Sequence, residues 1–328
     1  MADTSVTSYT CPYCRGASTG AETTCPNCGA PVDVARRTTS GWIEQPAIPD
    51  MTRIQLGRSM AQILGKLAPA VDIKLAAGEG VYFPDHNLLW QEPAVDVSAM
   101  SLRGAWNRMR AGLPVLMLEA RGPGIISFSH DSPGEMIAVP LEPGAGVDVR
   151  EHHLVAATLG VNYDWYDSGI WFSARPDKGA STQDGGVGLL KMGLDLAGLD
   201  TGDRDDRRDD EIEYYYPVGR QVDRFTAGEQ PGAVLLQVGG NAFLRTLADG
   251  ESILVKPPAL LYKDPSVGMQ MHVEFPGAGV QLWRTWGNRY LWLRLWGPGR
   301  VALQSSYERL EDPGTDFQDS CQYTQHMW

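Results

Sequence analysis

The chain of 328 residues contains no apolar run close to the roughly 20 residues that a membrane-spanning helix requires. Its first ten residues are polar and have no apolar core of the kind found in secretion signals. Cationic residues are also scarce, because 28 Lys and Arg stand against 40 Asp and Glu, a formal net charge of −12. Surfaces that bind phosphates or anionic lipids need a positive field. We therefore expect a cytoplasmic protein whose partners are proteins or small molecules, with no nucleic acid and no membrane span.

Signatures of common catalytic sites are missing as well. The sequence has no Gly-x-Ser-x-Gly elbow, no HExxH box and no phosphate-binding loop with its lysine. The pair His152-His153, followed by Asp164, Tyr166 and Asp167, is the strongest remaining candidate. On a strand, adjacent histidines point to opposite faces, so without a bend they cannot both bind one ion. We favour packing or solvent exposure for these histidines, and we expect that the protein is not an enzyme.

Cysteine is rare and clustered. Four of the five cysteines form two CxxC pairs separated by ten residues, Cys11, Cys14, Cys25 and Cys28. Two residues between cysteines allow a tight turn to aim both sulfurs at one ion, and two such turns supply four tetrahedral ligands. The spacing predicts a structural zinc ribbon, because all four positions are filled by protein. Two disulfides, which an oxidising compartment would favour, and an iron site are the alternatives.

The strongest positive pattern is an internal repeat. Six residues recur 106 positions later without a gap: Leu141, Gly144, Val147, Val149, Leu154 and Val161 recur as Leu247, Gly250, Ile253, Val255, Leu260 and Val267. In both copies a glycine turn precedes apolar residues two apart, a pattern typical of strands. Three similar turns at 122–124, 231–232 and 297–299 each precede an apolar run. The sequence therefore predicts an all-β body of two or three related β-units.

Composition divides the chain into segments. We expect a zinc ribbon at 1–31, a linker at 32–50, the β body at 51–312 and a polar tail at 313–328 that contains Cys321. Within the body, residues 200–211 are almost all charged and predict a solvated loop. The clearest helix candidate is Met100–Arg110, where Leu102, Trp106 and Met109 fall three or four residues apart.

An aromatic stretch at 283–296 is a candidate surface. From Tyr290 onward, the leucines at 291, 293 and 295 share one strand face, and Tyr290, Trp292, Arg294 and Trp296 share the other. We expect the leucine face to be core. The aromatic face has the composition of a protein interface, but it also fits a second buried layer, and both interpretations stay open.

Short motifs across Met51–Asp312 carry a family resemblance. They are Gly112-Leu113-Pro114-Val115, Gly122-Pro123-Gly124, Pro133-Gly134-Glu135, Val149-Arg150-Glu151-His152, Gly239-Gly240-Asn241-Ala242-Phe243, Asp249-Gly250-Glu251, Val255-Lys256-Pro257, Leu260-Leu261-Tyr262 and Trp296-Gly297-Pro298-Gly299. Together they resemble the altered-inheritance-of-mitochondria family, member twenty-four. The resemblance implies a β-sandwich like that of the tryptophan-attenuation protein, a homo-oligomer that is often a trimer, and a family whose bacterial members have no agreed biochemical function. The ribbon and the charged loop depart from the family, so its mitochondrial role does not carry over.

These features together predict a non-enzymatic, oligomeric scaffold or adaptor with a structural zinc ribbon. The alternative is a small-molecule-binding regulatory protein of the same β fold. A deep apolar cleft with converging polar groups would favour ligand binding, whereas a flat aromatic patch would favour an adaptor.

Overall fold

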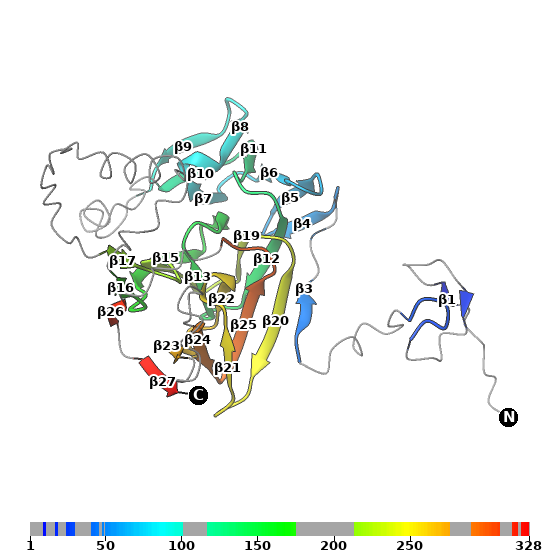
Figure 1. The fold of residues 1–328 in the computed structure, drawn as a ribbon. Coiled ribbons are helices and arrows are strands. Elements are labelled where there is room, and N and C mark those ends of the chain that lie inside the picture. Colours follow the sequence, from blue (N-terminus) through cyan, green and yellow to red (C-terminus); the bar gives the residue numbers. More distant parts are fainter. Residues whose placement is uncertain are drawn as a thin grey trace, which may run out of the picture.

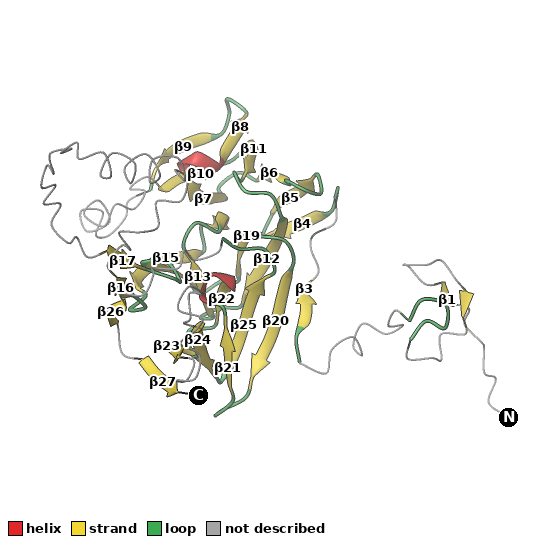
Figure 2. Ribbon diagram, in the orientation of Figure 1, coloured by secondary structure: helices red, strands yellow, loops and turns green. Residues whose placement is uncertain are grey.

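The computed structural model describes residues 9–10, 17–18, 24–29, 41–45, 48, 50–100, 117–174, 213–275, 290–308, 317–320 and 323–327. Regular structure in these residues is β-strand, with the short 3-10 turns η2 (Asp85–Asn87) and η3 (Pro257–Ala259) (Figures 1 and 2). The expectation of an all-β body is therefore confirmed. The helix candidate after Met100 and the charged loop at 200–211 lie outside the described residues. No helix in the described ranges has the length and hydropathy needed to cross a membrane.

Eighteen strands form three units of six, which we call units I, II and III. Unit I consists of β6 (Ala70–Leu75), β7 (Gly80–Pro84), β8 (Leu88–Gln91), β9 (Asp96–Ala99), β10 (Met117–Arg121) and β11 (Gly124–Ser129). Unit II consists of β12 (Glu135–Leu141), β13 (Gly146–Arg150), β14 (Leu154–Thr158), β15 (Val161–Asp167), β18 (Gln221–Ala227) and β19 (Gly232–Val238). Unit III consists of β20 (Ala242–Leu247), β21 (Ser252–Val255), β22 (Leu260–Lys263), β23 (Gly268–Phe275), β24 (Tyr290–Trp296) and β25 (Gly299–Gln304).

All three units share one pairing scheme. The first and third strands pair with the sixth, and the second and fourth strands pair with the fifth, always antiparallel. The last residue of each first strand, Leu75, Leu141 or Leu247, lies opposite the glycine that begins the sixth strand. Each third strand also shifts register after its first residue. The repeat inferred from the sequence therefore has a third copy, unit I.

Neighbouring units are joined by one kind of contact, the pairing of a second strand with a third strand. β7 of unit I pairs with β14 of unit II, and β13 of unit II pairs with β22 of unit III. We call these two contacts the junctions. They create a six-stranded sheet, β12-β19-β14-β7-β10-β9, and a seven-stranded sheet, β15-β18-β13-β22-β25-β20-β3. Each of these sheets therefore belongs to two units.

Shorter strands extend the units. β4 (Arg53–Leu56) and β5 (Ser59–Leu64) continue the sheet of β6, and β3 (Ile43–Gln45) pairs with β20. β16 (Phe172–Ala174) pairs with β17 (Glu213–Tyr215) and β26 (Phe317–Ser320), and β27 (Tyr323–Met327) runs parallel to β23. Part of the expected linker therefore pairs with the body, and the described parts of the polar tail are strands.

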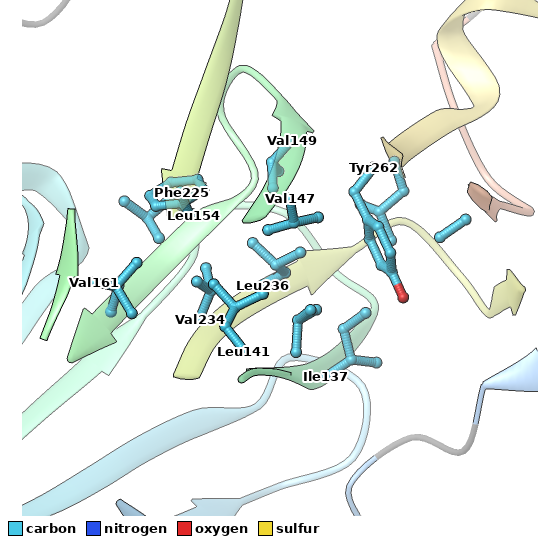
Figure 3. Packing of buried hydrophobic residues seen from close by; sticks show 14 of the residues in the cluster. Ile137, Leu141, Val147, Val149, Leu154, Val161, Phe225, Val234, Leu236 and Tyr262 are labelled. Atoms are coloured by element: carbon cyan, nitrogen blue, oxygen red, sulfur yellow. The ribbon is translucent and has the colours of Figure 1, made fainter. Parts of the chain in front are cut away.

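The repeated apolar residues form the core of unit II and its equivalents. Leu141, Val147, Val149, Leu154 and Val161 gather in one buried cluster with residues of β18 and β19 (Figure 3). Their counterparts Leu247, Val255, Leu260 and Val267 are buried in a second cluster. The two turn glycines agree as well, with φ of 76° at Gly144 and 75° at Gly250, where a side chain would be strained. The two copies therefore occupy equivalent places in related units, although Ile253, the counterpart of the buried Val147, is only partly buried.

The chain lengths within the units differ mainly at one connection, the one from the fourth to the fifth strand. It runs from β9 to β10 in unit I, from β15 to β18 in unit II and from β23 to β24 in unit III. In unit II this connection includes the strands β16 and β17. The six-strand frame is thus constant while this connection varies.

Replacing either Leu154 or Leu260 by alanine should lower the free energy of unfolding by about 2 to 5 kcal/mol, because each change leaves a cavity in a packed interior. Urea unfolding followed by circular dichroism measures the loss. The control is Leu67→Ala, since Leu67 is 84% exposed and its loss should cost less than about 0.5 kcal/mol. Equal stability of the Leu260→Ala and Leu67→Ala variants would contradict the equivalence of the units.

Candidate functional site

The four cysteines that predict a zinc site are only partly described. β1 (Tyr9–Thr10) and β2 (Ala17–Ser18) form an antiparallel pair whose connecting segment contains Cys11 and Cys14, which lie outside the described residues. At the second CxxC pair, Cys25 is buried and Cys28 is exposed. The amide of Gly29 donates a hydrogen bond to the carbonyl of Cys25 at 2.8 Å, and Gly29 has a φ of 73°. This hydrogen bond closes a tight turn that contains both cysteines of the second CxxC pair.

Among the described residues, no three His, Cys, Asp or Glu side chains gather in a way that would hold a metal ion. That search does not reach Cys11 and Cys14, so the predicted zinc site stays a prediction. Cys321 and the acidic residues of the 200–211 loop also lie outside the described ranges.

A buried polar cluster surrounds Asp148, and the sequence did not point to it. Asp148 lies on β13, and its carboxylate has no exposure to solvent. It accepts hydrogen bonds from Lys263 Nζ at 2.8 Å, from Arg224 Nε and Nη2 at 2.6 and 2.9 Å, and from the Tyr166 hydroxyl at 2.9 Å. Lys263 is 5% exposed and belongs to β22, so this cluster crosses the junction between units II and III.

The protonation states of this cluster are those of a structural ion pair. Burial alone would raise the pKa of Asp148, but the hydrogen bonds from Arg224, Lys263 and Tyr166 outweigh it, so the pKa lies below its usual value. Burial and the nearby Asp148 charge raise the pKa of Tyr166. The carboxylate is therefore ionised and already saturated with donors. A general base needs an acceptor that is free to take a proton, which Asp148 does not offer.

The two adjacent histidines lie in the turn between β13 and β14 rather than on a strand. His152 is exposed and has a φ of 68°. The ring of His153 turns inward, where its Nδ1 lies 2.9 Å from the carbonyl of Gln237 and its Nε2 lies 3.5 Å from Gln304 Nε2. Burial lowers the pKa of His153 to about 4. A neutral ring that donates through Nδ1 and accepts through Nε2 satisfies both neighbours.

The acidic and aromatic residues that follow the histidines are used elsewhere. Asp164 accepts a hydrogen bond from the amide of Trp165, and Asp167 accepts one from the amide of Gly169. Tyr166 belongs to the Asp148 cluster. Nothing in these contacts joins a nucleophile to a base, and the expectation that the histidines serve packing and solvent exposure fits their surroundings.

The aromatic stretch is described from Tyr290 onward. Leu293 and Leu295 are fully buried, so the prediction that the leucine face is core is confirmed for them. On the opposite face, Lys256 Nζ lies 3.9 Å from the ring centroid of Trp292. Trp296 packs on Gly268, where any side chain would collide with the indole, and yet Trp296 remains 39% exposed. On this face, Trp292 therefore has a cationic neighbour, and Trp296 is accessible to solvent.

Comparison with known proteins finds a family model that matches part of the chain and a similar solved structure. Residues 61–194 match the model of a family described as mitochondrial biogenesis AIM24. The structure is similar to the X-ray crystal structure of protein SPYM3_0169 from Streptococcus pyogenes, at 15% sequence identity and a TM-score of 0.48, over 76% of this chain and 94% of that chain. No curated protein matches the chain.

Replacing Asp148 by asparagine should lower the free energy of unfolding by about 3 to 5 kcal/mol, because the buried Lys263 ammonium then has no counter-charge. Chemical denaturation of the variant measures the loss. Asp131→Asn is the control, because Asp131 is 83% exposed. The double change Asp148→Leu with Lys263→Met should cost less than Asp148→Leu alone, because it also removes the stranded charge. A double variant that is less stable than this single variant would contradict the interpretation.

The low pKa of His153 makes stability depend on pH. The ring binds a proton near pH 6.5 in the unfolded chain but only near pH 4 in the folded protein, so acidification favours unfolding. Between these pH values, His153 should account for a loss of up to about 3 kcal/mol, which is complete below pH 4. The measurement is urea unfolding at pH 7, 5.5 and 4 for the wild type, His153→Gln and the half-exposed control His86→Gln. Identical pH profiles for the wild type and His153→Gln would show the prediction to be wrong.

Proposed function

We propose that the protein, whose residues 61–194 match the AIM24 family model, is a non-enzymatic, oligomeric scaffold or adaptor with a structural zinc ribbon. One observation carries this proposal. Among the described residues, Asp148 and His153 are held in structural hydrogen bonds, while large apolar side chains such as Leu89, Trp90 and Leu254 are exposed. Exposed apolar side chains on an ordered sheet are typical of surfaces that bind proteins.

The finer fold assignment is part of the same proposal. Strands one, three and six of a unit form one half-sheet, and strands two, four and five form another, which is the arrangement expected of a β-sandwich. We propose that each unit is a sandwich resembling that of the tryptophan-attenuation protein, and that the chain assembles into a homo-oligomer. We also propose a cytoplasmic location, because four thiolates persist in a reducing compartment.

The proposed ribbon would hold one zinc ion through Cys11, Cys14, Cys25 and Cys28. The tight turn at Cys25–Gly29 and the β1–β2 pair beside the first two cysteines support this arrangement. A four-thiolate zinc site leaves no open coordination position, so the ion would contribute folding energy to a segment too short for a hydrophobic core.

Purified protein should contain about one zinc per chain, and Cys25→Ser should lose it. Elemental analysis measures the metal, and mass spectrometry under non-reducing conditions measures disulfides. Two disulfides in place of metal would contradict the zinc assignment. The same pair of proteins then serves as matched baits in affinity purification. A partner bound by the wild type and lost with Cys25→Ser is expected of an adaptor that binds through its ribbon.

Failure to capture a partner with either bait, together with binding of a small molecule by the isolated body, would instead favour a small-molecule-binding regulator. The β body of the full-length Cys25→Ser variant should unfold over the same range of urea concentration as the body of the wild type. That match shows that a lost partner reflects the ribbon alone.

A further inference from the structure

The two junctions are identical in register, which defines what a third one would look like. In each of them, the third residue of a second strand lies opposite the fourth residue of a third strand. These pairs are Tyr82 with Ala157 and Asp148 with Lys263. The strands run antiparallel in both cases. Two strands of the same kinds remain at the ends of the three units, namely β8, the third strand of unit I, and β21, the second strand of unit III.

Within the described residues, β8 and β21 each have a free edge. β8 ends the sheet β4-β5-β6-β11-β8, and β21 ends the sheet β21-β24-β23-β27. The two strands lie at opposite ends of the body, β8 at the top and β21 at the bottom of Figure 1. Among the described residues, the three units therefore end in one strand of each complementary kind whose outer edge has no partner, and the two strands are too far apart to pair with each other.

Residues that are buried at the two junctions have exposed counterparts at both ends of the body. At the third position of the second strand, Tyr82 and Asp148 are buried, whereas Leu254 is 41% exposed. At the second position of the third strand, Val155 and Leu261 are buried, whereas Leu89 is 56% exposed. At the next position Ala156 and Tyr262 are buried, whereas Trp90 is 43% exposed. The end strands thus carry apolar residues at positions that an adjoining unit covers elsewhere in the chain.

Charged residues and proline, which normally help to prevent strand pairing, are missing from both edges. β8 reads Leu-Leu-Trp-Gln and β21 reads Ser-Ile-Leu-Val, with no charge and no proline. Other strands at sheet edges are protected, since β9 contains Asp96, β12 contains Glu135 and Pro140, and β15 contains Asp164 and Asp167. Uncharged, proline-free edges with exposed apolar residues are suited to strand addition.

We propose that β21 of one copy pairs with β8 of a second copy, antiparallel, with Leu254 opposite Gln91 and Val255 opposite Trp90. This register reproduces the junctions inside the chain, and it covers Leu89, Trp90 and Leu254. The contact is head-to-tail, because each copy contributes a different strand. The proposal rests on the oligomeric scaffold proposed above and names both its partner, a second copy, and the surface that binds it.

The test uses two full-length variants that each block one edge, Leu254→Arg on β21 and Trp90→Arg on β8. Size-exclusion chromatography with light scattering at tens of micromolar protein measures mass. The wild type should be oligomeric and each variant should be monomeric. Leu67→Arg, which places the same charge at an exposed leucine away from both edges, should stay oligomeric. Circular dichroism and urea unfolding confirm that each monomeric variant is folded.

Mixing the two variants distinguishes this interface from others. Leu254→Arg keeps an intact β8 and Trp90→Arg keeps an intact β21, so an equimolar mixture should form a 1:1 heterodimer that grows no further. A contact between two identical edges would not be restored by mixing. A monomeric wild type, a single variant that stays oligomeric, or a mixture that stays monomeric would each overturn the proposal. A wild type that assembles in this way yet captures no partner would instead refute the adaptor function alone.

Discussion

The body depends on the pairing of a second strand with a third strand from the next unit. Backbone amides and carbonyls at a buried edge must be paired, and the strands β7, β13, β14 and β22, which each pair with one strand of their own unit, obtain their second partner from a neighbouring unit. No unit is therefore complete by itself. The hydrophobic clusters follow from this sharing, since the cluster centred on unit II also contains Tyr82 of unit I and Tyr262 of unit III.

The two junctions have the same backbone register but carry different side chains at the corresponding pair. At the junction of units I and II, Tyr82 lies opposite Ala157, a pairing of a large and a small side chain. At the junction of units II and III, the corresponding pair is the buried Asp148 and Lys263. A buried ion pair tolerates few shifts of register, because a displaced charge would lose its partner. We therefore infer that Asp148 fixes the alignment of units II and III, while shape does so between units I and II.

The sequence predicted features that depend on neighbouring residues, but it did not predict contacts between strands that are distant along the chain. The spacing of Leu154 and Leu260 was enough to predict equivalent buried positions, because alternation along a strand is a local property. The sequence analysis left the number of units at two or three, although Gly78-Glu79 and Leu88-Leu89 of unit I match Gly250-Glu251 and Leu260-Leu261 of unit III.

Other features have no local signal. Asp148 and Lys263 are 115 residues apart, so nothing in either segment announces the pair. The exposure of Leu89, Trp90 and Leu254 was equally unpredictable, since apolar residues in a strand pattern indicate burial. Only the position of their strands at the ends of the row of units explains it. The composition of the polar tail gave no indication of a strand, yet its segment β27 pairs with β23.

The connection between the fourth and fifth strands has a consequence for how such a chain gains new parts. It joins the fourth and fifth strands, which lie in the same half-sheet as the second strand, and its described residues take part in neither junction. In unit II this connection, residues 168–220, is far longer than the corresponding residues 100–116 of unit I and 276–289 of unit III. Added sequence enters there without changing any register that joins the units. Each unit can therefore carry a different insertion at this connection, while the strand pairing that joins the three units stays the same.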